Sequence, residues 1–142
     1  MAKQNYAKAK GRRESGTFFA LPHVVHRSPN WPKLSANAVK LLIDLGSQLN
    51  GHNNGNLTVA HKILSKHGWP NRTSIARAKA ELLHYGFIQQ TRQGGLRNGP
   101  SLYALTWKPI DECLQAKWPL ETKKTKVASG LYKHDKPPLK KP

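Results

Sequence analysis

The feature that most restricts the fold is an amphipathic helical repeat that stops at a glycine and leads directly into a strand. Apolar residues recur there at steps of three and four, the spacing of one buried helix face: Ile75, Ala78, Leu82 and Tyr85. Asn71 or Thr73 can cap the N-terminus of this helix, and Gly86 ends it. The β-prone run from residue 87 to 92 follows at once, so a strand is predicted directly after this helix.

Two further helices are predicted before this one. Ser35 supplies an N-cap for a helix that Asn50 and Gly51 close. Its buried face is predicted to contain Ala38, Leu41, Leu42, Leu45 and Leu49. Thr58 caps a second helix of about three turns that ends near Gly68, and a short helix at Val24 and Val25 is compatible with the local sequence.

A two-stranded hairpin is predicted after the third helix. Its strands span residues 87–92 and 102–107, and its glycine-rich tip spans residues 94–100. Tyr103, Leu105 and Trp107 alternate along the second strand and should face the core. The fold class is therefore α+β, mostly α, with three helices and a two-stranded hairpin.

The charge is concentrated in two segments that we expect to be disordered tails. Residues 1–16 hold five basic residues and hardly any apolar ones, and residues 113–142 hold eight lysines among prolines. The folded domain is predicted to span residues 17–112. The formal charge of +17 favours a polyanion as partner, and no apolar run suggests a membrane span. Solubilising extensions are the alternative interpretation of the tails.

The order of helix, helix, tight turn, helix and basic hairpin resembles the winged helix-turn-helix domains of bacterial and phage regulators and replication proteins. The resemblance covers residues 34–107. In such domains a leucine pair followed by a glycine and Phe-Ile leads from the recognition helix to the wing, and here residues 82–88 read Leu-Leu-His-Tyr-Gly-Phe-Ile. The resemblance implies double-stranded DNA as partner, with the third helix in the major groove and the hairpin on the backbone or minor groove.

A helical wheel indicates which side chains of the third helix would meet DNA. The face opposite the apolar one holds Thr73, Ala76, Arg77, Ala80 and His84. The guanidinium of Arg77 is suited to two parallel hydrogen bonds with a guanine edge, while Thr73 or Ala76 offers a methyl group to thymine. Arg72 and Lys79 flank this face and could contact phosphates. A solvated helix surface is the competing interpretation, and Glu81 is the one acid that argues against base contacts.

At the predicted wing, Arg92 and Arg97 bracket the glycine-rich tip. Arginine that enters a narrow minor groove reads DNA shape, so both are candidate contacts. A plain hairpin with incidental charge is the alternative.

The sequence gives no reason to expect catalysis, a metal or a cofactor. The histidines lack the spacing and the neighbouring carboxylates of a metal site, acids are sparse, and no phosphate-binding loop precedes a helix. Cys113 is the only cysteine, which fits a reducing compartment, so we expect a non-enzymatic cytoplasmic protein associated with the nucleoid.

Other functions stay open at this point. The basic tails would also suit an RNA- or ribosome-binding protein, and a winged helix can bind a protein partner in a replication complex. A transcriptional regulator and a replication protein of a bacterium, phage or plasmid would need the same surface. The oligomeric state is undetermined.

Overall fold

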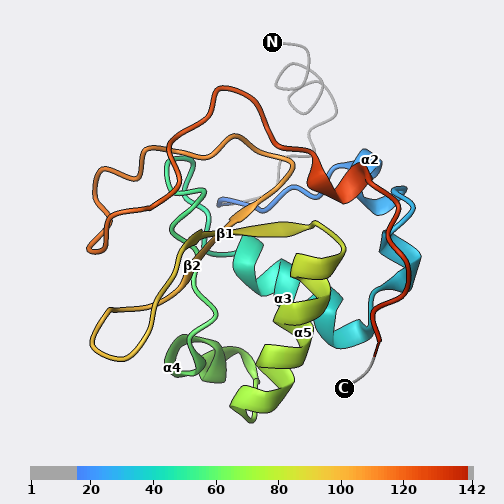
Figure 1. Cartoon of the computed structure of the whole chain (residues 1–142), viewed down its shortest axis with the longest axis horizontal. Coiled ribbons are helices and arrows are strands. Elements are labelled where there is room, and N and C mark those ends of the chain that lie inside the picture. Colours follow the sequence, from blue (N-terminus) through green and yellow to red (C-terminus); the bar gives the residue numbers. More distant parts are fainter. Residues whose placement is uncertain (1–15, 141–142) are drawn as a thin grey trace.

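The computed structural model describes residues 16–140 and forms an α+β fold, mostly helical, with one antiparallel two-stranded sheet (Figure 1). Its elements are α2 (His23–His26), η1 (Trp31–Lys33), α3 (Ala36–Gly46), α4 (His61–Leu64), η2 (Ser65–His67), α5 (Arg72–His84), β1 (Ile88–Arg92), β2 (Leu102–Leu105) and η3 (Leu131–Lys133). The expected N-terminal tail lies outside the described residues, apart from Gly16. None of the described helices is long and apolar enough to span a membrane.

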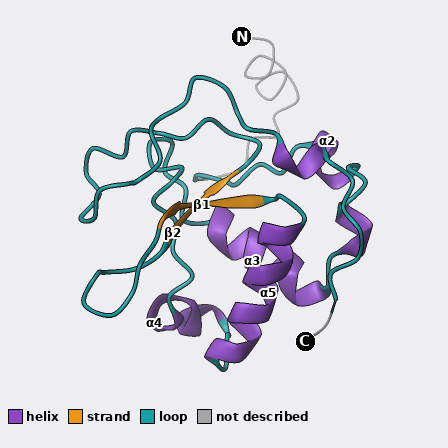
Figure 2. Cartoon of the chain, viewed as in Figure 1, coloured by secondary structure: helices purple, strands orange, loops and turns teal. Residues whose placement is uncertain are grey.

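Helices α3 and α5 pack against each other and form the centre of the core (Figure 2). Ser35 and Asn71 cap them as predicted: each side-chain oxygen accepts a hydrogen bond from a backbone N–H three residues later. The predicted apolar faces are buried, with Leu41 and Leu82 fully inaccessible, except that Leu49 is half-buried and lies beyond the end of α3. Gly86 takes a φ of 79° after the last turn of α5, which confirms it as the helix stop.

The second predicted helix is much shorter than expected. The side chain of Gln48 accepts from Thr58 N at 2.9 Å and donates to Thr58 O at 2.9 Å, which keeps Thr58 outside the helix. Helix α4 therefore begins only at His61 and passes into the 3₁₀ turn η2. The prediction of three α-helical turns from Thr58 was wrong, because contacts distant in sequence override the local capping signal.

Helix α3 also ends earlier than predicted, at Gly46 rather than near Asn50. The ring of Phe19 lies so close to Gly46 that a Cβ there would be 2.4 Å from it. The chain continues with tighter turns, in which Gln48 N donates to Leu45 O and Leu49 N donates to Gly46 O.

The predicted hairpin is present, and β1 pairs with β2 with an irregularity between Gln90 and Arg92. Leu57, which precedes α4, adds an isolated antiparallel bridge to Tyr103 of β2. All four residues of β2 are buried, not only the alternate ones. Trp107 lies beyond the strand and is half-buried against Phe19, with ring centres 6.2 Å apart.

The C-terminal segment, residues 113–140, packs on the domain where the sequence predicted a disordered tail. Tyr132 is only 3% exposed and stacks on Phe87, with ring centres 6.1 Å apart. Glu121 N and Thr122 N both donate to Thr91 O of β1, which covers the outer edge of the sheet. The predicted domain boundary at residue 112 thus falls inside the folded unit, and Figure 1 shows the segment in orange and red running across the top and down one side.

Asn30 joins the C-terminal segment to the rest of the domain. Its side chain is fully buried, and Nδ2 donates to the carbonyl oxygens of Tyr85, Tyr132 and His134 at 3.0, 3.1 and 2.7 Å. Its Oδ1 accepts from Lys136 N at 2.9 Å. One amide thus satisfies backbone groups from two parts of the chain that the sequence separates widely, the end of α5 and residues 132–136.

Candidate nucleic-acid interface

The first two turns of α5 present an exposed face of small and basic side chains. Arg72, Thr73, Ala76 and Arg77 are exposed, as is Ala80 at the start of the next turn. Asn71 caps this end of the helix with a bond of 2.9 Å from Ser74 N, and Ile75 and Ala78 anchor the opposite side in the core. The wheel therefore assigned the two faces of the helix correctly.

The C-terminal half of α5 is less accessible than the sequence suggested. His84 is half-buried, and its Nε2 lies 2.7 Å from Pro137 O of the C-terminal segment. Leu139 N donates to the hydroxyl of Tyr85 at 2.9 Å, so the segment follows this end of the helix. Lys79 is also half-buried. The open part of the predicted face is therefore its N-terminal part, while His84 is half-buried and bonded to the C-terminal segment.

Glu81 has a structural partner inside the protein. Its Oε1 accepts from Ser35 N at 2.9 Å and its Oε2 accepts from Ser35 Oγ at 2.6 Å, at the N-terminus of α3. A carboxylate at this position is favoured by the partial positive charge of a helix N-terminus. The carboxylate of Glu81, the acid that argued against base contacts, is thus bound to the start of α3.

Arg92 was predicted to contact DNA from the wing, but the structure contradicts this assignment. The residue is only 7% exposed. Its Nη1 donates to Pro100 O at 2.7 Å, its Nη2 donates to Asn98 Oδ1 at 3.4 Å, and its guanidinium lies over the ring of Trp118 at 4.9 Å. Arg92, at the end of β1, therefore bonds to the returning half of the hairpin loop and packs on the C-terminal segment.

Arg97, in contrast, is exposed at the tip of the hairpin. Its backbone adopts a φ of 61°, a conformation that few residues other than glycine take. The ion pairs that the structure contains among residues 16–140 involve Lys33, Lys40 and Lys124, so Arg72, Arg77 and Arg97 keep their charges available.

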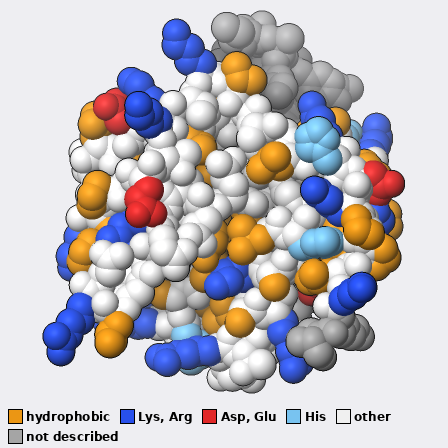
Figure 3. Space-filling model, viewed as in Figure 1, with side chains coloured by type: hydrophobic (Ala, Val, Ile, Leu, Met, Phe, Trp, Pro, Cys, Tyr) orange, Lys and Arg blue, Asp and Glu red, His pale blue; other side chains and the backbone are white. Residues whose placement is uncertain are grey.

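The hairpin tip, α4 and the N-terminal end of α5 lie along the same lower edge of the molecule in Figure 1. We call this surface the basic edge and define it by the exposed residues Lys62, Lys66, Arg72, Thr73, Ala76, Arg77, Ala80 and Arg97. Glu81 is the only acidic residue between Asp44 and Asp111, and it is bound to Ser35. In Figure 3 basic side chains are spaced along this edge, whereas acidic ones lie higher in the view.

Lys62 and Lys66 were not among the residues predicted from the sequence. They lie on α4 and η2, which the sequence suggested to be one longer helix with no assigned contact. The available signal was their spacing of four residues opposite buried Leu64, which gives them a common solvent-facing side.

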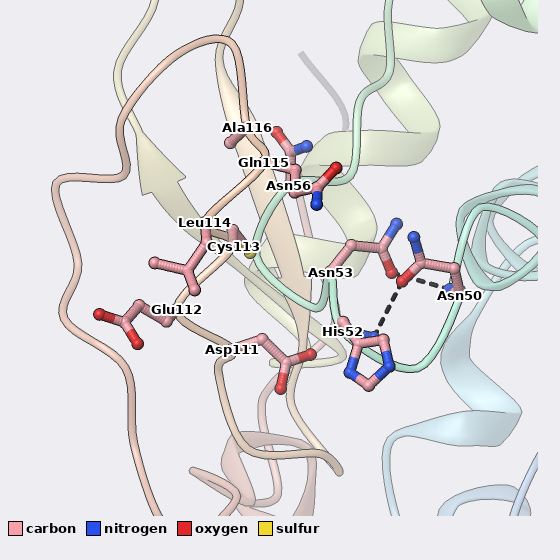
Figure 4. A pocket seen from close by; sticks show the side chains of 10 residues that line it. All are labelled: Asn50, His52, Asn53, Asn56, Asp111, Glu112, Cys113, Leu114, Gln115 and Ala116. Atoms are coloured by element: carbon pink, nitrogen blue, oxygen red, sulfur yellow. Dashed lines mark hydrogen bonds between the residues drawn. The ribbon is translucent and has the colours of Figure 1, made fainter.

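A separate pocket of about 640 Å³ lies away from the basic edge, between the turn at residues 50–56 and residues 111–116 (Figure 4). Its polar groups shape the turn: Asn50 N donates to Asn53 Oδ1 at 2.9 Å, and Asp111 Oδ2 accepts from Asn54 N at 2.8 Å. Burial, and secondly the charge of Asp111, raise the pKa of the Cys113 thiol and keep it protonated. Across residues 16–140, no three His, Cys, Asp or Glu side chains gather as a metal site requires.

A comparison with known protein families, with curated proteins and with solved structures finds no match to this chain. The case for a function therefore depends on the geometry and charge of the basic edge.

Proposed function

We propose that the protein binds double-stranded DNA through the basic edge, with the first two turns of α5 in the major groove and the hairpin tip against an adjacent groove. The observation that carries the proposal is the exposed N-terminal half of α5, where Arg72 and Arg77 flank Thr73 and Ala76 and no acid faces outward. Small residues let a helix approach the groove floor, and arginine can bind guanine with two parallel hydrogen bonds.

The element order supports the same proposal. Helix α3, the Leu57 bridge, the short α4, α5 and the hairpin follow each other as in a winged helix-turn-helix domain, in which recognition-helix N-termini contact base edges. Lys62 and Lys66 would contact phosphates beside α5, since the first helix of such a motif crosses the DNA backbone. Duplex RNA fits this arrangement poorly, because its major groove is too deep and narrow for a helix to read.

The experiment is a selection of bound sequences from a random duplex pool, followed by titrations of the selected site at several salt concentrations. The double variant Arg72→Ala/Arg77→Ala should lose binding to the selected site. The matched control is Lys123→Ala/Lys126→Ala, which removes the same charge from exposed positions away from the basic edge. Equal losses in the two double variants, or tighter binding to an RNA duplex of equal length, would contradict the proposal.

A further inference from the structure

The tip of the hairpin is a tight turn with two large side chains at its end. Asn98 N donates to Gly95 O at 3.1 Å, which makes residues 95–98 a β-turn with Leu96 and Arg97 as its two central residues. Side chains at the central positions of a turn project beyond the strands. Leu96 is 95% exposed, the most exposed large apolar side chain among residues 16–140.

Hydrogen bonds and close packing hold the turn in place, although its end is exposed to solvent. Gly95 N donates to Gly99 O at 3.2 Å, and Gly94 N donates to Ser101 Oγ at 2.9 Å. Below it, Gly99 lies so close to Trp118 that a Cβ would be 2.7 Å from the ring. Gln93 N also donates to Glu121 Oε1 at 2.7 Å. The C-terminal segment thus supports the hairpin on either side of the turn that holds Leu96.

The conformation of Arg97 adds a second observation. A non-glycine residue at a positive φ carries conformational strain, and such strain is common at functional sites. Three glycines lie within three residues of this position, yet the strained position holds an arginine. The turn therefore presents a basic and an apolar side chain next to each other, and Figure 3 shows such a pair at the end of the hairpin, lower left.

We infer that the hairpin tip enters the DNA minor groove and that Leu96 acts as a wedge between two base pairs, so that the protein bends the DNA it binds. This inference rests on the proposed function. Arg97 beside Leu96 would be drawn to the negative potential of the groove. Apolar wedges of this kind unstack a base step and kink the duplex by about 20–90°.

Double-stranded DNA fits this tip better as a binding partner than another protein does. The tip shares the basic edge with α5, and a helix in the major groove brings a neighbouring hairpin to the next minor groove. The loop from residue 93 to 101 contains no acidic residue, and the carboxylate of Glu121, which touches the loop, accepts from Gln93 N at its start, away from the central turn residues. A lone exposed leucine is common on protein surfaces, but here it sits at the hairpin tip, which lies along the same lower edge in Figure 1 as the first turns of α5.

The test measures binding and bending separately on one duplex that carries the selected site. Energy transfer between dyes at the two ends reports the bend, and 2-aminopurine next to the site reports loss of stacking. Leu96→Ala should keep the affinity within about tenfold but lose the bend and the fluorescence rise. The matched control is Leu114→Ala, which removes a leucine that is also highly exposed (83%) but lies away from the basic edge, and should change neither signal.

The possible failures are distinguishable. If the wild-type protein binds the site and leaves the duplex straight, or if Leu96→Ala bends it as strongly as the wild type, the wedge is refuted while DNA binding stands. If the wild-type protein binds no duplex at any salt concentration, the proposed function fails, and the wedge fails with it. If Leu114→Ala abolishes the bend as well, the bend does not come from the tip, and the inference is overturned.

Discussion

The guanidinium of Arg92 lies over the ring of Trp118, 4.9 Å from its centre, and joins the hairpin to a part of the chain 26 residues further on. Arg97 extends from the same hairpin into solvent. Two arginines that bracket one loop thus have opposite environments, because only Arg92 lies on the face that the C-terminal segment covers.

This difference predicts opposite phenotypes for the two arginines. Arg92→Ala should lower the free energy of unfolding by about 1–3 kcal/mol, since it leaves Pro100 O without its charged donor. Arg97→Ala should change it by less than about 0.5 kcal/mol and should weaken DNA binding. Urea melts and binding titrations of both variants check this, and equal stability of the two variants would show that the guanidinium contacts of Arg92 contribute nothing.

Removal of the C-terminal segment should destabilise the domain. A chain that ends at Glu112 loses the stacking of Tyr132 on Phe87 and the cover of β1, so we expect a lower melting temperature or no cooperative transition. Tyr132→Ala in the full chain should cost about 3–5 kcal/mol. Lys126→Ala, at an exposed position of the same segment, is the control. A truncated chain as stable as the full one would restore the boundary predicted from the sequence.

The stability of the domain should depend on the charge as well as on the size of the side chain at position 30. Asn30→Ala leaves three buried carbonyl groups without their donor and should cost at least about 2 kcal/mol. Asn30→Asp should cost more at neutral pH, because a carboxylate would face those oxygens and its charge would be offset only in part by the ammonium group of Lys33, which lies 3.5 Å from Oδ1. Protonation restores a donor, so burial should raise the pKa of this aspartate and the deficit should shrink as pH falls. Thermal melts of both variants between neutral and mildly acidic pH measure this, and a pH-independent deficit would argue against the carbonyl contacts.

Arg77 and Lys79 should differ in how they affect DNA binding. Arg77 is exposed beside Thr73 and Ala76, whereas Lys79 is half-buried at the side of the helix. Arg77→Ala should cost about 1–3 kcal/mol on the selected site and relax the preference at one base position. Lys79→Ala should weaken binding to all sequences alike. If Arg77→Ala lowers specific and nonspecific binding by the same factor, Arg77 is a phosphate contact.

The sequence alone determined the local elements whose signals lie within a few residues. Ser35 and Asn71 cap helices as predicted, Gly86 ends α5, and the apolar repeat of α5 separates its buried face from the face with Arg72 and Arg77. These features depend on backbone hydrogen bonds and periodicity, which short sequence windows contain. They also gave the candidate residues on α5 and at Arg97.

The tertiary structure decided everything that depends on contacts between distant residues. The bond between Gln48 and Thr58 shortens the second helix. The carboxylate of Glu81 is bound to Ser35. The guanidinium of Arg92 packs on Trp118 and is therefore absent from the predicted interface. A segment rich in lysine and proline has too little apolar surface to fold alone, so its composition predicted disorder. It is ordered because Tyr132 and the carbonyl groups around Asn30 find partners on the core of the domain, and no local pattern encodes such partners.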